Sequence, residues 1–203
     1  SPMDKLKAVL ELAHLGFRMH PLQSKNKIPI LGQWQDRATT NEATIRLWAS
    51  QYTDCNWGIA TGEKSGIIVI DIDPGHGGDL TWRKLQQQHG YVETVSVRTG
   101  SGGTHFYFAY PNGRDIGNSP GKVGSGIDVR GNNGQVVAPS SIHPNGTSYE
   151  WINPPGEYDI EQIPNWLLKL LEADSAVDFN PIGERVDKGN RNNSIYHAAL
   201  ALA

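Results

Sequence analysis

Asp71 and Asp73 stand at the end of an apolar run, Ile67 to Ile70, with one isoleucine between them. Such a run is typical of a buried strand, and side chains two positions apart on a strand point to the same face. An isolated carboxylate against an apolar core is strongly unfavourable, whereas two on one face can share one or two Mg²⁺ or Mn²⁺ ions. Alternatively, Asp73, Pro74 and Gly75 form an ordinary turn, which explains Asp73 well and Asp71 poorly.

A third carboxylate, Asp128, lies between Ile127 and Val129 in a short apolar segment with glycines nearby. Glycine lets another stretch of backbone approach closely. Taken alone, such an aspartate is more often a solvent-facing strand residue than a metal ligand. Its setting matches that of Asp71 and Asp73, which strengthens the metal-site interpretation of all three acids.

Residues 100–103, Gly-Ser-Gly-Gly, connect two segments of strand character. They form either a simple hairpin loop or a turn whose successive N–H groups cradle phosphate oxygens. The pattern matches neither of the familiar glycine-rich phosphate motifs. His105 follows directly, and a single strand histidine is usually structural. With Arg98 across the hairpin, however, His105 would be well placed to meet a triphosphate.

The formal net charge of −3 argues mildly against a dedicated duplex-DNA binder, because such proteins are usually basic. A local basic groove stays open, since several basic residues lie near glycine-rich turns: Lys25, Lys27, Arg98, Lys122 and Arg130. Lys27 is either one of these contacts or a solvated charge. His143 is either a plain loop residue or part of the same pocket.

The chain of 203 residues is long enough for one substantial core. No apolar stretch approaches the roughly 20 residues of a membrane span, so we expect no membrane association. Cys55 is the single cysteine and cannot form an internal disulfide, which favours a reducing compartment and therefore a cytoplasmic protein.

Helical periodicity predicts four helices in the first 175 residues, over residues 4–16, about 40–50, 80–90 and 160–173. We expect Ile45, Leu47 and Trp48 on the buried side of the second helix. Asp79 is expected to cap the third helix, and Pro164 to lie near the first turn of the fourth.

Strands are predicted over residues 17–22, 57–62, 66–74, 126–131, 135–142 and 148–152, with two more within 94–111. Hairpins mix with helices without strict alternation, so α+β fits better than a doubly wound sheet. Residues 1–175 then form one domain. The polar stretch 176–193 is typical of a linker, and the stripe Ile195, Ala198, Ala199 and Leu202 predicts the first helix of a truncated C-terminal helical domain.

Taken in order, these residues resemble the primase–polymerase (Prim-Pol) domain of the archaeo-eukaryotic primase superfamily, in the form found in phage, plasmid and other mobile-element replication proteins. The superfamily's motifs read here as Asp71-Ile72-Asp73, Gly103-Thr104-His105 and Ile127-Asp128, and the likeness covers roughly residues 5 to 170. It implies mixed or antiparallel sheets flanked by helices around an RRM-like palm. It also implies a DNA primase and polymerase of bacterial, archaeal or virus-infected cells.

The resemblance implies a two-metal nucleotidyl transfer in which Asp71, Asp73 and Asp128 hold two Mg²⁺ or Mn²⁺ ions and a ribo- or deoxynucleoside triphosphate is the substrate. His105 would contact the triphosphate. Further phosphate contacts are expected from the backbone amides of Ser101, Gly102 and Gly103, from Arg98, and from Arg130, Lys27 and His143. The motif carries glycine where relatives carry serine, so a hydroxyl there must come from Ser101 or Thr104.

The expected partners are a single-stranded DNA template, a primer and nucleotides, together with a C-terminal helical domain and a helicase in the full-length protein. Two alternatives remain from the residues alone. One is a metal-dependent phosphohydrolase that uses the same acids with His105 and His143, although the sequence lacks the paired His-x-His or His-Asp patterns usual there. The other is a non-catalytic nucleic-acid-binding module, against which the three intact acids argue.

Overall fold

The structure is a computed structural model that describes residues 1–173. The predicted linker and C-terminal helix, 176–203, lie outside the described residues and stay predictions. Within residues 1–173, helices and mainly antiparallel strands combine into the α+β class expected from the sequence. No helix of that part of the chain is long and apolar enough to cross a bilayer.

A large sheet of seven strands forms the centre of the fold, and β3 (Ile67–Ile72) lies in its middle. Ile67 to Ile70 are apolar on both faces and all buried, which suits a strand covered on both sides. Strand β3 is antiparallel to both of its neighbours. The other strands are β4 (Ser96–Arg98), β5 (Thr104–Ala109), β6 (Ser119–Gly124), β7 (Ile127–Arg130), β9 (Glu150–Asn153) and β10 (Glu161–Gln162).

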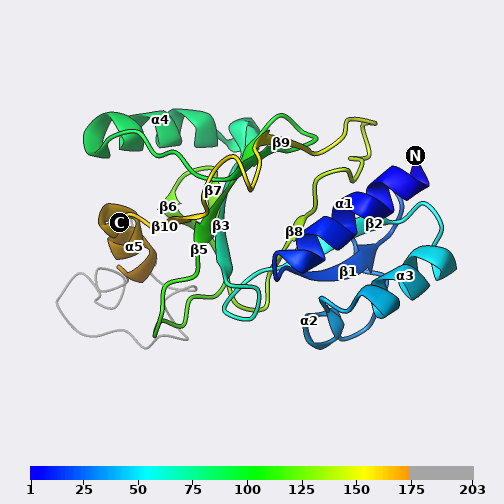
Figure 1. Cartoon of the computed structure of the whole chain (residues 1–203). Coiled ribbons are helices and arrows are strands. Elements are labelled where there is room, and N and C mark those ends of the chain that lie inside the picture. The colour runs from blue at the N-terminus through cyan, green and yellow to red at the C-terminus, as the bar shows by residue number, and fades with distance from the viewer. Residues whose placement is uncertain (174–203) are drawn as a thin grey trace.

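A smaller sheet joins β1 (Arg18–Leu22), β2 (Asn56–Ala60) and β8 (Gln135–Val137). With α1 (Pro2–His14) and α3 (Glu42–Gln51), it shares one apolar core with one face of the large sheet. Figure 1 shows these elements together on one side of β3 and β5. The two sheets therefore meet along a common core, and any cavity at its end is bordered by both.

The opposite face of the large sheet is covered by α4 (Gly78–His89) and α5 (Asn165–Glu172), which lie on the other side of β3 and β5 in Figure 1. Alternate residues of β3 serve the two cores, since Ile67 and Val69 belong to the first and Ile68 and Ile70 to the second. The alternation fixes Asp71 on the face that looks toward the small sheet. Two short helices complete the chain, α2 (Trp34–Arg37) and η1 (Pro74–His76).

The structure adds β6 and α2, which the sequence did not predict, and it differs from the prediction at three named sites. Gly77, with φ of 81°, takes the N-cap of α4, so Asp79 falls within the first turn instead, where a negative charge is still favourable. Glu161 and Gln162 pair with β5 as a strand, and the last helix therefore starts only after Pro164. Leu47 is 54% exposed, because two residues from Ile45 it lies about 200° around the helix axis from the buried side.

Candidate active site

Asp71, His105 and Asp128 form one row across neighbouring strands. In the antiparallel register, Asp71 of β3 lies opposite His105 of β5 on one side and Asp128 of β7 on the other. Directly paired residues point to the same face with their Cβ atoms about 5 Å apart. The sheet thus brings together three residues that are far apart in the sequence, as the metal-site prediction requires.

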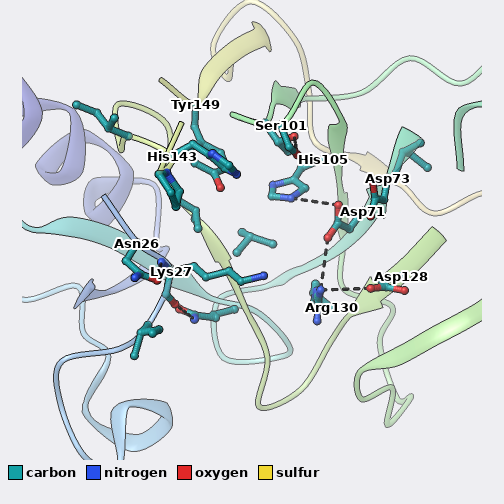
Figure 2. A pocket seen from close by; sticks show the side chains of 18 of the residues that line it. Asn26, Lys27, Asp71, Asp73, Ser101, His105, Asp128, Arg130, His143 and Tyr149 are labelled. Atoms are coloured by element: carbon teal, nitrogen blue, oxygen red, sulfur yellow. Dashed lines mark hydrogen bonds and ion pairs between the residues drawn. The ribbon is translucent and has the colours of Figure 1, made fainter. Parts of the chain in front are cut away.

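The row borders a cavity of about 590 Å³ between the two sheets. Asp73 and Ser101 line it beside the row, and Lys27 and His143 line it from the other wall. Figure 2 shows these side chains around a common space, with Lys27 reaching across toward Arg130. A volume of this size lies in the range of small-ligand sites.

Arg130 links two of the acids. Its Nη2 lies 3.3 Å from Oδ2 of Asp128 and 3.5 Å from Oδ2 of Asp71, contacts drawn as dashed lines in Figure 2. Arg130 follows Asp128 by two residues on β7, so both side chains leave the same face of the strand, as expected from the spacing. The guanidinium offsets part of the charge of two carboxylates that would otherwise repel each other.

His105 is 6% exposed, and its Nε2 lies 3.4 Å from Oδ1 of Asp71. Burial alone would raise the pKa of the Asp71 carboxyl, but the neighbouring His105 and Arg130 outweigh burial and hold that pKa below its ordinary value. Asp71 is therefore an ionised, preorganised carboxylate at neutral pH. The other ring nitrogen of His105, Nδ1, is buried without a hydrogen-bond partner, so the ring is oriented by Asp71.

Asp73 is less buried than the sequence suggested, with 46% of its side chain exposed. It accepts a hydrogen bond from the N–H of Gly75 at 2.8 Å, so the turn interpretation also applies to it. Its other oxygen lies 2.6 Å from Nδ1 of His76, which raises the pKa of that histidine. Sequence reasoning missed His76, although a histidine three residues after the second acid of the pair was the available signal.

The glycine-rich turn has a structural use that limits its role as a phosphate cradle. The N–H groups of Gly102 and Gly103 donate to the backbone and hydroxyl oxygens of Thr99, so they are committed within the turn. A side chain at Gly100 would collide with His143. Of the residues expected to form the cradle, only Ser101 lines the cavity.

Arg98 and Thr104 face away from the site. Arg98 of β4 lies opposite Thr104 of β5, and the adjacent pair in the register is Val97 and His105. Because neighbouring residues on a strand alternate in direction, both side chains leave the opposite face of the sheet, and neither lines the cavity. The position of Arg98 across the hairpin suggested a shared face with His105, but in the β4–β5 register Val97, not Arg98, lies opposite His105.

Tyr149 is a cavity residue that the sequence reasoning did not single out. It is 8% exposed, and its ring centre lies 6.5 Å from that of His105 and 6.2 Å from that of His143. Burial, together with the negative charge of Asp71, raises the pKa of its phenol. The alternation in the segment Ser148 to Trp151 indicated a strand, but nothing in it indicated which cavity the tyrosine would reach.

A family model described as the N-terminal domain of bifunctional DNA primase/polymerase matches residues 9–166. The chain belongs to this family. It is accordingly a primase/polymerase domain, an enzyme of the nucleotidyltransferase class that serves DNA replication, and its family acts on DNA and nucleotides. The resemblance drawn from the sequence motifs is confirmed over nearly the same span. No curated protein sequence matches the chain.

The donors of this primase/polymerase domain fit the divalent metals typical of the family. Carboxylate oxygens are the ligands that Mg²⁺ and Mn²⁺ prefer, and Asp71 and Asp128 are direct neighbours across two strands. Residues 1–173 contain no ready-made cluster of three or more acidic, histidine or cysteine side chains. In the structure, Arg130 contacts Asp71 and Asp128, and His76 contacts Asp73.

Proposed function

We propose that the cavity beside Asp71, Asp73 and Asp128 is the site of template-directed nucleotidyl transfer, and that these carboxylates hold two Mg²⁺ or Mn²⁺ ions. When bound, the ions would activate the primer 3′-hydroxyl and offset the charge of the departing pyrophosphate. The observation that carries the proposal is the row Asp128, Asp71 and His105 across three adjacent strands at one cavity.

The incoming triphosphate would be held by the cationic and polar groups around the same cavity. Lys27 reaches into it, and within residues 1–173 no carboxylate pairs with its ammonium. Arg130 and His105 approach from the acid side, and the Ser101 hydroxyl adds a neutral donor. Cations on opposite walls suit an extended polyphosphate chain.

His143 and Tyr149 border the cavity on the wall opposite the acids. Their rings offer flat surfaces for a sugar or base, so we assign the nucleoside to this side and the phosphates to the Asp71 side. A single-stranded template and a primer would enter through the open side of the cavity. The sheet that bears the acids would then serve as an RRM-like palm, with the C-terminal helical domain and a helicase as partners in the full-length protein.

The test is a product assay with Mn²⁺, a primed template and dNTPs, on the parent and on Asp71→Asn. The parent should lengthen the primer and release pyrophosphate, and Asp71→Asn should lose at least about 100-fold in rate, because a preorganised charge at the reacting centre is removed. Asp79→Asn is the matched control, since Asp79 is an exposed acid on α4 away from the cavity. Release of free phosphate without extension would instead favour the phosphohydrolase.

A further inference from the structure

Arg130 lies where a shared metal ion would have to bind. One nitrogen, Nη2, contacts Oδ2 of Asp71 and Oδ2 of Asp128, at 3.5 Å and 3.3 Å. Carboxylate oxygens that bind Mg²⁺ sit about 2.0–2.1 Å from the ion. With the ion bound, a guanidinium between the same two oxygen atoms would lie very close to a dication, and two positive charges at such a distance repel each other strongly. The ion and the guanidinium therefore compete for one place.

The Arg130 side chain is 34% exposed, so its head can leave the acids without unfolding the strand. Moving the guanidinium away from the acids costs free energy unless other acceptors replace the carboxylates, because otherwise it gains hydrogen bonds only to water. The facing wall of the cavity carries Lys27, another cation. A bare ion therefore displaces Arg130 without giving it a partner.

A triphosphate changes this balance. Phosphate oxygens match the geometry of a guanidinium as well as carboxylates do. A metal–triphosphate complex supplies cations for Asp71 and Asp128 and, at the same time, anions for Arg130 and Lys27. Every charged group that loses its partner in the cavity then gains another.

We propose that Arg130 makes divalent metal and nucleoside triphosphate bind cooperatively, so that the site selects the metal–triphosphate complex over the bare ion. The inference rests on the proposed function, since it needs the metal ions at Asp71 and Asp128. It assigns Arg130 a role distinct from a plain phosphate contact, because its removal should strengthen the binding of metal alone while weakening the binding of triphosphate.

The experiment is a Mn²⁺ titration of the whole chain, followed by the electron paramagnetic resonance signal of free Mn²⁺. It is run with and without a non-hydrolysable dNTP, and a protein-free titration corrects for the Mn²⁺ that the nucleotide itself holds. In the parent, the nucleotide should tighten Mn²⁺ binding about 10-fold, within the usual range of coupling between sites. In Arg130→Gln, Mn²⁺ alone should bind several-fold tighter than in the parent, and the nucleotide should add little.

Arg130→Lys should fall between the two, because an ammonium is a point charge that cannot hold the planar two-carboxylate contact. Arg83→Gln removes an equal charge from the exposed side of α4 and should behave like the parent. Thermal melting of each variant confirms that it is folded. Arg130→Gln binding Mn²⁺ no tighter than the parent, or keeping the parent's coupling, overturns the inference.

Asp71→Asn separates this inference from the proposed function on which it rests. If Asp71→Asn loses Mn²⁺ binding while Arg130→Gln matches the parent, the metal site stands and only the competition is refuted. If Asp71→Asn binds Mn²⁺ as the parent does, the metal site lies elsewhere and both proposals fall.

Discussion

At the scale of single residues, the site is a balance of charges. Asp71 is mostly buried, yet its pKa lies below the ordinary value because His105 and Arg130 face it. In the sequence, two acids follow an apolar strand without an evident partner. The structure shows that His105 and Arg130 offset the charge of Asp71, the more buried of the two. On the proposed function, metal binding would therefore exchange one cation, the Arg130 guanidinium, for another at these carboxylates.

His105→Ala should weaken dNTP binding, because a buried imidazole held by Asp71 offers a charge-assisted phosphate contact. Such a contact is worth about 1.5–3 kcal/mol, or roughly 10- to 100-fold in affinity. Titration with a non-hydrolysable dNTP measures the change. His14→Ala, which alters a histidine side chain that is 79% exposed, is the control. Equal affinity of His105→Ala and the parent would return His105 to a structural role.

At the scale of elements, strand parity decides which predicted residues meet. The period of two placed Asp128 with Arg130 on one face of β7, and it placed Asp71 with Asp73, which follows the end of β3, at one cavity. It could not relate one strand to another, because the register between β3, β5 and β7 depends on pairing between segments far apart in the chain. For this reason Arg98 was placed wrongly relative to the cavity.

The same limit explains the cavity residues that the sequence did not reveal. Tyr149 reaches the site only because its segment packs beside the glycine-rich turn, where Gly100 leaves room for His143. His76 joins Asp73 through the short helix η1, a local geometry that the turn residues allowed but did not specify. Element types could be predicted from periodicity, whereas these contacts arise from tertiary packing.

Gly126→Ala tests how the turn between β6 and β7 positions Asp73. Gly126 accepts a hydrogen bond from the N–H of Asp73, and a methyl group there would collide with the backbone of Gly78. We expect a loss of about 1–3 kcal/mol in unfolding free energy beyond that of Gly121→Ala, measured in urea. Both glycines have positive φ, 76° and 68°, but Gly121 has open space around it. If Gly126→Ala and Gly121→Ala lost the same unfolding free energy, the backbone around Gly126 would accommodate the methyl group without strain.

His20 of β1 should make stability depend on pH. Burial lowers the pKa of His20 to about 4. Between the ordinary pKa of 6.5 and that value, His20 is protonated in the unfolded chain but stays neutral in the folded protein. The contribution of the neutral His20 to the free energy of unfolding is therefore complete above pH 6.5. It falls by about 3 kcal/mol as the pH drops toward 4, because each unit of pKa difference corresponds to ~1.4 kcal/mol. Urea titrations at several pH values should show a flatter profile for His20→Phe, whereas an unchanged profile would remove this assignment.

At the scale of the whole molecule, the chain carries a net charge of −3, and among the described residues the lysines and arginines that line the cavity are Lys27 and Arg130. We expect single-stranded DNA to bind this chain weakly and with a steep dependence on salt, because only a local group of phosphate contacts is available. Fluorescence anisotropy across a salt series measures both. Tight binding that salt leaves unchanged would contradict this picture of the surface.

The proposed function requires the acids, the metal ions and the triphosphate to meet in one cavity. Crystals soaked with Mn²⁺ and a non-hydrolysable dNTP test it most directly, through the anomalous scattering of manganese. We expect manganese peaks between Asp71, Asp73 and Asp128, with Arg130 turned from the two carboxylates to the phosphates. Manganese peaks only at other side chains, with Arg130 still bridging Asp71 and Asp128 beside a bound nucleotide, would contradict it.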